Sequence, residues 1–484
     1  MDIIFWTGIF SETEPYRPIG AYQLAHWMRS NGYECQVIDF IQTMSADELY
    51  GFTKKFISSN TLCIGVSSTF WSVRDPDDKH QRWTPGGIPP VVKETIDLIK
   101  ANHPDIKLVL GGSQADNKPQ HFYNLFDAIV VGYGEEMFLD LIDSWRKDKK
   151  LLVPTMQGNV PYLTSSPNKR FDIMCSDHRF IRQDCIVPGE TLPLEIGRGC
   201  IFSCKFCSYL NIGKTKNDYV RNMDFLQQEI LHNKEQFGTT NYILLDDTFN
   251  DSNEKVRAWG GMLNELPFGV NYTGYMRADL LSRFPEQIDI FKDTGLVAAH
   301  FGVETFNPEA SMLIGKGWNG KEGKDFFIRL RNTWADKTLF MMSLIVGIPP
   351  ETEEDCIATN EWLIENNMPS WVWHPLRINT SSRTNKSEFE KNYQKYGFVP
   401  TVSGGWIAKN GNNYIQARKL AGRLMEDDRR ARSNLSNWQM LSFMTLGYTR
   451  EEMTKVKISE FDYSEKDRRF NEFVVQYKKL LTEL

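Results

Sequence analysis

An apolar strand leads directly into a cysteine cluster in the stretch Leu192-Pro193-Leu194-Glu195-Ile196-Gly197-Arg198-Gly199-Cys200-Ile201-Phe202-Ser203-Cys204-Lys205-Phe206-Cys207. The cysteines have the spacing C-x3-C-x2-C, and three thiolates in so short a loop can ligate three irons of a [4Fe–4S] cube. A structural zinc site needs four ligands, and no second Cys or His pair lies nearby in the sequence. The spacing therefore favours a cluster on Cys200, Cys204 and Cys207 over zinc or inert buried cysteines.

The cysteine loop opens a series of about six βα units. Apolar strands are predicted over residues 192–196, 242–245, 272–276, 297–303, 339–346 and 371–378, with helices between them. So regular a series favours a partial (β/α)6 TIM-type barrel, whose chemistry lies at the carboxyl ends of the strands. The residues at those ends include Asp246-Asp247, Arg277, Glu304 and Gly347.

A second βα series precedes the cysteine loop. Strands are predicted over residues 2–6, 35–40, 62–67, 107–110 and 128–131, and their alternation with helices indicates a doubly wound parallel sheet. Glycines follow two neighbouring strands, at Gly111-Gly112 and at Gly132-Tyr133-Gly134. Such glycines allow a ligand to approach the strand ends closely, although tight turns alone would also explain them.

One long loop, residues 69–90, interrupts this N-terminal sheet and contains His80. Loops of such length are often lids or binding loops. A lone histidine in a loop is more often solvated than a ligand, so both interpretations of His80 stay open.

The sequence predicts four segments. Residues 1–150 form a Rossmann-like domain, residues 151–190 a linker, residues 191–395 the partial barrel and residues 396–484 a small helical domain. Helices are expected there over residues 414–425, 435–445 and 470–481, and the charged run at residues 426–430 is typical of a solvated face.

Composition excludes several classes of protein. Of the 484 residues, 41% are hydrophobic and 24% charged, which excludes a disordered chain and a collagen-like repeat. The net charge of −6 provides no general attraction to nucleic acid. No apolar run approaches the ~18 residues that span a bilayer, and no basic signal region precedes the first strand. We therefore expect a cytoplasmic protein without membrane contact.

The cysteine motif and the residues at the strand ends together resemble a known superfamily. Phe206 before the last cysteine gives C-x3-C-x-φ-C, which is similar to the signature of the radical S-adenosylmethionine (SAM) superfamily. Residues 245–249, 275–279, 301–305 and 346–352 resemble successive strand-end motifs of its subgroup with an N-terminal cobalamin-binding domain. The turn from Gly132 to Glu135 resembles a Gly-x-Gly-Glu turn of that domain. The resemblance covers roughly residues 1–150 and 190–380.

This resemblance implies a [4Fe–4S] cluster, SAM and cobalamin as cofactors. It implies that Phe206 lies against the adenine, that Glu304 accepts ribose hydroxyls and that Arg277 donates to the methionine carboxylate. Three further groups complete the SAM site it implies: Asp247, Gly302 and the apolar wall of Gly347 and Ile348. The cobalamin site would comprise Ser67, Gly111, Gly112, Gly132, Gly134 and Glu135.

One departure concerns cobalt. The pattern D-x-H-x-x-G, whose His binds the lower face of cobalt, is absent, since the first strand leads into Thr7-Gly8-Ile9-Phe10-Ser11-Glu12. Some members of the subgroup bind cobalamin without this His, and others use no cobalamin.

The leading hypothesis is a cobalamin-dependent methyltransferase acting on an unactivated carbon. The alternatives are a radical SAM enzyme of another reaction type, such as a cyclase or an oxidative enzyme, and a non-catalytic metal- or nucleotide-binding module. A small-molecule or peptide substrate and an electron donor such as flavodoxin or ferredoxin are the expected partners. Alternation on the last strand places Trp371, Trp373 and Arg377 on one face and His374 on the other, without indicating which face meets the substrate.

Overall fold

The computed structural model describes residues 1–10, 14–74, 83–85, 87–112, 115, 120–147, 155–157, 160–164, 171–207, 219–317, 320–335, 337–378, 386–401, 405–409, 411–427, 429–430 and 433–484. They form two compact units. Unit 1 comprises Met1–Pro193, His232–Gly238 and Glu465–Leu484, and unit 2 comprises Leu194–Leu231 and Thr239–Ser464. This division differs from the four segments expected from the sequence, because two strands within residues 151–190 belong to the N-terminal sheet and most of the last helix belongs to unit 1.

Unit 1 is built on a seven-stranded sheet in the order β2-β1-β3-β6-β7-β9-β8. All its pairs are parallel except the hairpin between β8 and β9. The strand order reverses between β1 and β3, and ligands of doubly wound sheets bind at such a point. The strands are β1 (Ile3–Trp6), β2 (Cys35–Ile38), β3 (Cys63–Ser67), β6 (Lys107–Gly111), β7 (Ala128–Val131), β8 (Thr155–Gln157) and β9 (Val160–Thr164), and a separate hairpin joins β4 (Ser72–Arg74) to β5 (Trp83–Pro85).

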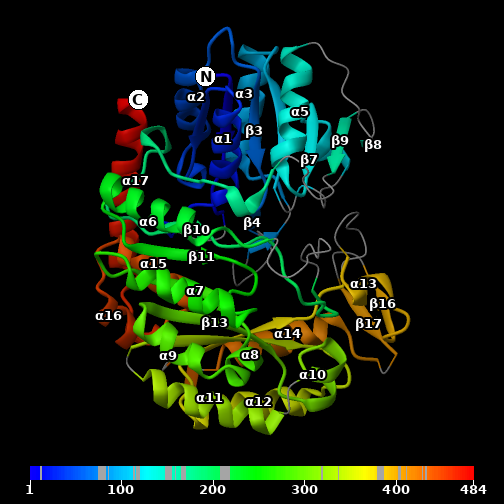
Figure 1. Ribbon diagram of the computed structural model, residues 1–484. Helices are drawn as coiled ribbons and strands as arrows, with labels where there is room; N and C mark the ends of the chain where they lie inside the picture. The colour runs from blue at the N-terminus through cyan, green and yellow to red at the C-terminus, as the bar shows by residue number, and fades with distance from the viewer. Residues whose placement is uncertain are drawn as a thin grey trace. The chain divides into compact units, whose positions relative to one another are not determined.

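Helices cover both faces of this sheet (Figure 1). Neighbouring residues of β1 show the two faces, because the Phe5 ring packs on Phe138 of α5 while the Trp6 indole donates a hydrogen bond to Thr53 of α2. Helix α2 was not expected from the sequence, although Ser45 and Glu48 form a capping box at its start. The helices are α1 (Ile19–Ser30), α2 (Ala46–Phe56), α3 (Pro90–Asn102), α4 (Gln120–Tyr123), α5 (Gly134–Arg146) and α17 (Tyr463–Glu483).

Unit 2 contains six strands that lie in the sheet in chain order, β10-β11-β12-β13-β14-β15. The pairs from β11 to β15 are parallel, as the sequence predicted for a partial barrel. The strands are β10 (Leu192–Glu195), β11 (Asn241–Leu245), β12 (Asn271–Met276), β13 (Leu296–Glu304), β14 (Leu339–Val346) and β15 (Ser370–Pro375). The helices between them are α6 (Met223–Phe237), α7 (Asn253–Asn264), α8 (Ala278–Arg283), α9 (Glu286–Asp293), α10 (Pro308–Ile314), α11 (Gly320–Trp334) and α12 (Glu353–Glu365).

The segment after β15 is only partly the separate helical domain that the sequence predicted. Arg450 of α16 donates hydrogen bonds to the carbonyls of Leu296 and Lys337, at the amino ends of two strands (3.2 and 2.9 Å). This contact lies at the end of the sheet opposite the carboxyl ends, where Asp247, Arg277 and Glu304 lie. The segment contains α13 (Glu388–Lys391), β16 (Phe398–Pro400), β17 (Trp406–Ala408), α14 (Tyr414–Met425), α15 (Asn437–Thr445) and α16 (Arg450–Lys455) (Figure 1).

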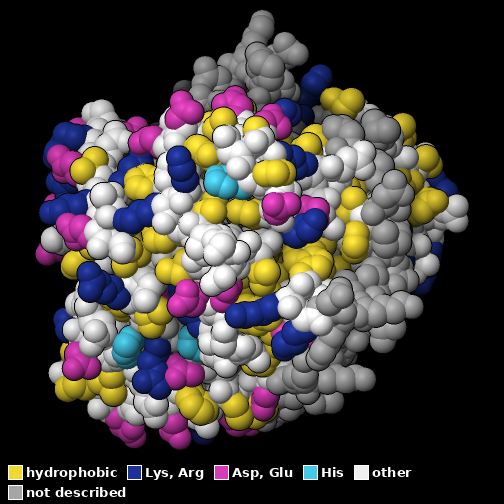
Figure 2. All heavy atoms as spheres, turned by 90° about the horizontal axis from the view of Figure 1, so that it is seen from above, with side chains coloured by type: hydrophobic (Ala, Val, Ile, Leu, Met, Phe, Trp, Pro, Cys, Tyr) yellow, Lys and Arg dark blue, Asp and Glu magenta, His cyan; other side chains and the backbone are white. Residues whose placement is uncertain are grey.

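The described surface agrees with the charge balance of the sequence. On the face shown in Figure 2, basic and acidic side chains are interspersed among the described residues. None of the described helices is long and apolar enough to cross a membrane.

A buried arginine joins four distant segments of unit 1. The Arg17 side chain, 1% exposed, forms ion pairs with Glu190 and Asp39, whose side chains are 1% and 0% exposed. Its guanidinium also donates to the Tyr22 hydroxyl (2.5 Å), and the Tyr477 hydroxyl of α17 accepts a hydrogen bond from the Asp39 backbone (2.7 Å). Because burial disfavours each charge alone, these groups stabilise the unit only together.

Arg17→Met should therefore destabilise unit 1 strongly. Removing the cation leaves two buried carboxylates unpaired, and breaking a buried pair costs about 3–5 kcal/mol. Urea unfolding followed by tryptophan fluorescence measures the change. Lys93→Met, which breaks an exposed pair with Asp97, is the control and should change the unfolding midpoint little. A midpoint for Arg17→Met equal to that of the control would contradict the assignment.

Candidate active site

The cysteine loop follows β10 and is held by backbone hydrogen bonds within unit 2. The Lys205 N–H donates to the carbonyl of Ile314, the last residue of α10 (3.1 Å), and the Lys205 carbonyl accepts from Phe389 of α13 (2.9 Å). Within the loop, Cys207 N–H donates to the Cys204 carbonyl (3.0 Å). Lys205 thus joins the loop to α10 and to α13.

Each of the first two thiols has a polar neighbour. The Sγ of Cys200 lies 3.3 Å from the Thr248 hydroxyl and accepts from the Phe202 N–H at 3.5 Å. Cys204 Sγ accepts a hydrogen bond from Nη1 of Arg277 at 3.4 Å. Burial raises the pKa of the Cys200 thiol, against the hydrogen bonds from Thr248 and Phe202. The polar donors around the thiols suit sulfur atoms that carry negative charge.

The three cysteines remain partly accessible. Among the described residues, no three His, Cys, Asp or Glu side chains converge on one metal ion. A four-iron cube requires no such convergence, since each thiolate binds a different iron. A loop with three accessible thiolates therefore fits a cluster better than a single ion.

Arg277 follows β12 and is buried rather than part of a surface ion pair. It binds Asp279 through two hydrogen bonds (3.0 and 2.7 Å), and its guanidinium lies 4.1 Å from the centre of the Phe202 ring. The fully buried Asn250 accepts from the Arg277 N–H and donates to its carbonyl (2.8 and 2.9 Å). These contacts fix Arg277 against the cysteine loop, which the sequence did not indicate.

The end of β13 is strained and contains a buried ion pair. Glu304 has a φ of 69°, next to an irregularity in the pairing with β14. Such strain in a residue other than glycine is common at functional sites. The Glu304 carboxylate lies 3.5 Å from Nζ of Lys316, which donates to the Gly302 carbonyl at 2.7 Å. Burial raises the pKa of Glu304, and the Lys316 charge opposes this.

This ion pair gives Gly302 a specific role. A Cβ at position 302 would lie 2.5 Å from Oε1 of Glu304 and 3.3 Å from Nζ of Lys316. Glycine therefore makes room for the pair, and its place in the SAM site stays a prediction. Lys316 lies beyond α10 and carried no recognisable signal in the sequence.

The end of β14 is covered by another side chain that the sequence did not single out. Gly347 has a φ of 104°, and a Cβ there would lie 2.6 Å from the Trp406 ring. Trp406 is itself fixed by a hydrogen bond from its indole to the Leu376 carbonyl (2.9 Å). The neighbouring Ile348 is fully buried, so an apolar wall exists here and Trp406 packs against its glycine.

The two aspartates after β11 differ in exposure. Asp246 is buried and pairs with the buried Lys255 (2.9 Å), which also pairs with Asp251 (2.7 Å). Asp247 is exposed at the same strand end. The structure therefore leaves Asp247, the residue named from the sequence, accessible for binding, and Phe206 is also partly accessible.

The inner face of the sheet carries accessible polar side chains. Tyr275 on β12 is 41% exposed, and its ring lies 4.8 Å from that of His300 on β13. His374 on β15 is also accessible. Neighbouring protein atoms remove part of the water around its imidazole and so lower its pKa, and the Arg377 charge lowers this pKa further.

The tryptophans of β15 face the opposite side. Trp371 and Trp373 are buried, and both indoles donate to Oδ1 of Asn360 on α12 (3.0 and 3.2 Å). This resolves the alternative left open by the sequence, because the aromatic pair packs against an outer helix and His374 points to the inner face.

The residues expected to bind cobalamin lie at the carboxyl edge of the sheet in unit 1. Ser67 ends β3, Gly111 ends β6, Gly132 follows β7, and Gly134 and the buried Glu135 begin α5. His80 lies outside the described residues.

The fold itself explains why residue 112 is a glycine, without the close approach of a ligand. Its φ is 96°, and a Cβ there would lie 2.8 Å from the Thr69 backbone nitrogen. The chain's own backbone therefore fills the space beside Gly112. A Cβ at Gly111 would meet only the Val130 carbonyl, at 3.7 Å, so the space there is less restricted.

Glu351, which follows β14, provides a pH-dependent test of the site's packing. Burial raises its pKa to about 8, against a hydrogen bond from the Thr305 hydroxyl (2.5 Å). Because this pKa lies above that of the unfolded chain, the protonated carboxyl stabilises the fold, and the contribution is lost as the pH rises through about 8. The free energy of unfolding of Glu351→Gln should therefore rise relative to that of the parent between about pH 6 and about pH 9. Urea titrations across this range measure the difference, and a constant difference would contradict the interpretation.

Comparison with known proteins identifies the fold. Residues 194–363 match the radical SAM superfamily. No curated protein matches the chain by sequence. The structure resembles radical S-adenosylmethionine methyltransferase TsrM from Kitasatospora setae, solved with tryptophan substrate and a SAM analogue, at 16% identity, 99% coverage of each chain and a TM-score of 0.63.

Two further solved structures share this architecture. TsrM with cobalamin and a [4Fe-4S] cluster bound is 16% identical, with 98% of this chain and 99% of that chain covered and a TM-score of 0.63. The cobalamin-dependent S-adenosylmethionine radical enzyme OxsB, with aqua-cobalamin and S-adenosylmethionine bound, is 14% identical. That match covers 100% of this chain and 72% of OxsB, with a TM-score of 0.58. Residues 194–363 therefore form a radical SAM domain, and the chain has the fold of these solved structures.

Proposed function

We propose that the protein is a cobalamin-dependent radical SAM methyltransferase that methylates an unactivated carbon of a small molecule or peptide. The observation that carries the proposal is the cysteine loop at the carboxyl end of β10, with Thr248 and Arg277 against its sulfur atoms. The likeness in fold to TsrM along nearly the whole chain supports the choice of methyl transfer.

The chain's own residues would hold the cofactors. Cys200, Cys204 and Cys207 would bind the cluster, and Arg277 positions their loop. A reduced [4Fe–4S] cluster supplies the electron that cleaves the SAM sulfonium, and cobalamin carries a methyl group. Such chemistry requires a site from which water is excluded, because water would allow side reactions.

The SAM site would lie along the carboxyl ends of the strands. Glu304, held by Lys316, would accept the ribose hydroxyls, and the exposed Asp247 would bind a polar group of SAM. Phe206 and Ile348 would give the adenine an apolar surface. Since Asp279 and Cys204 already occupy three N–H groups of Arg277, a SAM carboxylate would have to use its remaining donors.

The substrate would meet the inner face of the sheet in unit 2. The rings of Tyr275 and His300 lie there 4.8 Å apart and tilted to each other, and the lowered pKa of His374 favours its neutral imidazole. A neutral imidazole can accept a proton from a bound substrate. This inner face suits a flat or heteroaromatic substrate. The tryptophans of β15 are buried on the opposite face and do not reach it.

Cobalamin would bind at the carboxyl edge of the sheet in unit 1, where Ser67, Gly111, Gly132, Gly134 and Glu135 lie. A radical SAM enzyme of another reaction type, with no cobalamin, is the second candidate. One position favours this second candidate. The close approach of Thr69 is sufficient to explain why residue 112 is a glycine, so no bound cobalamin is needed to explain it.

The cluster can be tested by single substitutions. Changing any one of Cys200, Cys204 or Cys207 to Ala should remove the ~400 nm absorption expected of iron–thiolate clusters and abolish reductive cleavage of SAM. Three ligands are the minimum that leaves one iron open, so none of them is redundant. Absorption spectra and the formation of 5′-deoxyadenosine under dithionite are the measurements. Cys35→Ala and Cys356→Ala, which remove buried thiols elsewhere, are the controls, and undiminished cleavage by Cys204→Ala would refute the assignment.

Cobalamin binding gives a second test. Protein reconstituted with hydroxocobalamin should retain about one cobalamin per chain, because ligands bind at the carboxyl edge of a doubly wound sheet. The spectrum of the bound cobalamin should be base-off. Gly111→Val should reduce retention by about tenfold or more, because its methyl groups enter the less restricted space at the end of β6. Equilibrium dialysis and visible spectra measure both.

Gly51→Val provides the matched control, since nothing lies within 4 Å of its Cβ on α2. Gly112→Val is unsuitable, because its clash with Thr69 would disturb the fold itself. If folded, cluster-loaded parent protein retains no cobalamin, the second candidate replaces the first.

A further inference from the structure

A small hairpin in unit 2 exposes apolar side chains in a regular pattern. β16 and β17 pair antiparallel, with Val399 opposite Ile407. Phe398 and Trp406 are buried between the hairpin and the unit, with ring centres 5.2 Å apart. Because strand residues alternate, Val399 and Ile407 point outward and are 59% and 48% exposed. Two exposed apolar side chains side by side are typical of the centre of a protein interface.

The hairpin is connected to the cysteine loop through Phe389 of α13. Phe389 of α13 donates its backbone N–H to the carbonyl of Lys205, which lies between Cys204 and Cys207 (2.9 Å). Its ring packs on Tyr396 and Phe398, with centres 4.7 and 5.8 Å away. Nζ of Lys205 lies 5.8 Å from the centre of the Tyr396 ring. The apolar pair is therefore connected to the loop of thiolates by one short chain of contacts.

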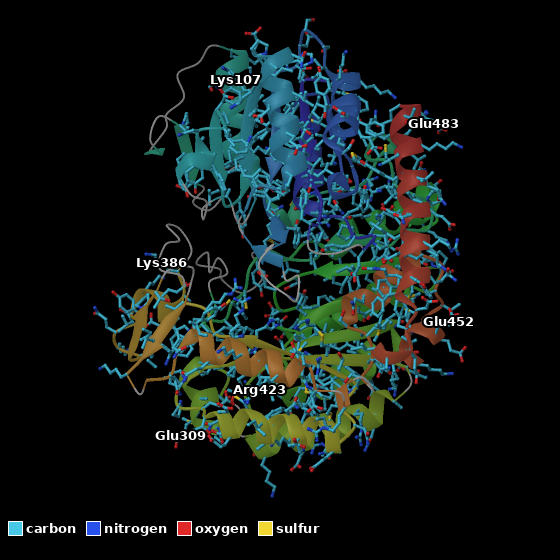
Figure 3. All side chains as sticks on the ribbon, turned by 180° about the vertical axis from the view of Figure 1, so that it is seen from behind. Lys107, Glu309, Lys386, Arg423, Glu452 and Glu483 are labelled. Atoms are coloured by element: carbon cyan, nitrogen blue, oxygen red, sulfur yellow. The ribbon has the colours of Figure 1, made fainter. Side chains whose placement is uncertain are left out.

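Exposed basic side chains lie in the same segment as the apolar pair. Lys391, Lys395 and Lys409 are exposed, Nζ of Lys395 lies 5.5 Å from the Tyr396 ring, and the Lys409 backbone donates to Gly397 (2.9 Å). Figure 3 marks Lys386 at the start of this segment and Arg423 on α14. Residues 386–419 contain six Lys or Arg and two Glu, whereas the whole chain has a net charge of −6.

The two acidic residues reduce this charge only in part. Glu390 is buried, where it accepts the Ser387 N–H at the start of α13 (2.7 Å). Glu388 accepts from Asn392 and from the Tyr396 hydroxyl (3.0 and 3.1 Å). The segment thus stays locally basic on a chain that is acidic overall. We define the hairpin surface as Val399 and Ile407 with Lys391, Lys395 and Lys409.

We propose that the hairpin surface is the docking site for an acidic one-electron donor protein of the flavodoxin class. The inference rests on the proposed function, since the electron is destined for the cluster on Cys200, Cys204 and Cys207. Opposite charges steer the donor, and the apolar pair excludes water at the contact. One electron passes from the donor's flavin hydroquinone, which becomes the semiquinone, to the cluster. No covalent bond of this chain forms or breaks.

Binding provides the first test. Isothermal titration of the cluster-loaded protein with an FMN-containing flavodoxin should show a Kd that rises with salt, because screening weakens exposed charges. The triple variant Lys391→Glu, Lys395→Glu and Lys409→Glu should raise the Kd by about tenfold or more. The matched control, Lys54→Glu, Lys100→Glu and Lys479→Glu, makes the same change of charge on exposed sites of unit 1 and should bind like the parent.

A neutral variant separates the apolar contribution. Val399→Ser with Ile407→Ser alters only exposed positions, so it should fold like the parent and still bind flavodoxin more weakly. Thermal unfolding of each variant verifies the fold.

SAM cleavage provides the second test, with two reductants. The triple variant should lose most 5′-deoxyadenosine formation driven by reduced flavodoxin and keep that driven by dithionite, which needs no docking surface. Failure of the parent with dithionite would refute the proposed function, and the titration would still decide about the hairpin surface. A parent that does not bind flavodoxin at low salt, or a triple variant that binds it unchanged, would overturn the proposal.

Discussion

Unit 1 depends on the requirement that a buried guanidinium be paired on every side. Arg17 meets this requirement with Glu190, Asp39, Tyr22 and two backbone carbonyls, and the rings of Phe40 and Tyr477 lie against it. Arg17 lies in the loop after β1, and its partners come from α1, the residues that follow β2, the segment before β10 and α17. A charge that is costly to bury thereby specifies which distant segments come together.

Unit 2 uses the same principle near its chemistry. Asn250 fixes the Arg277 backbone, Arg277 touches the cysteine loop, and Lys316 holds Glu304 in a strained conformation. The residues proposed to contact cofactors are thus held in place by neighbouring side chains of unit 2. Such support matters because groups around a reactive centre must be in place before the reaction begins.

Local patterns in the sequence were sufficient for both βα series, for the cysteine loop and for the strand ends at which polar residues gather. They were not sufficient for β8 and β9, which are short and lie among Pro and Ser residues, or for the partners of the glycines. Gly112, Gly302 and Gly347 look alike in sequence, yet Thr69, Lys316 and Trp406 occupy the spaces beside them. Those neighbours come from loops and elements outside the strand-end motifs, so only the tertiary structure shows them. The direction of Trp371 and Trp373 was likewise decided by Asn360 on a separate helix.

The route of the chain through unit 1 has a consequence for synthesis on the ribosome. Domains generally fold from the amino terminus as they emerge, but the core of unit 1 includes residues 465–484, which are translated after the whole of unit 2. Until Tyr477 arrives, Asp39 and the Phe40 ring lack part of their cover. Part of the core of unit 1 therefore stays exposed while unit 2 is synthesised. A chaperone would be most useful to the growing chain during this interval.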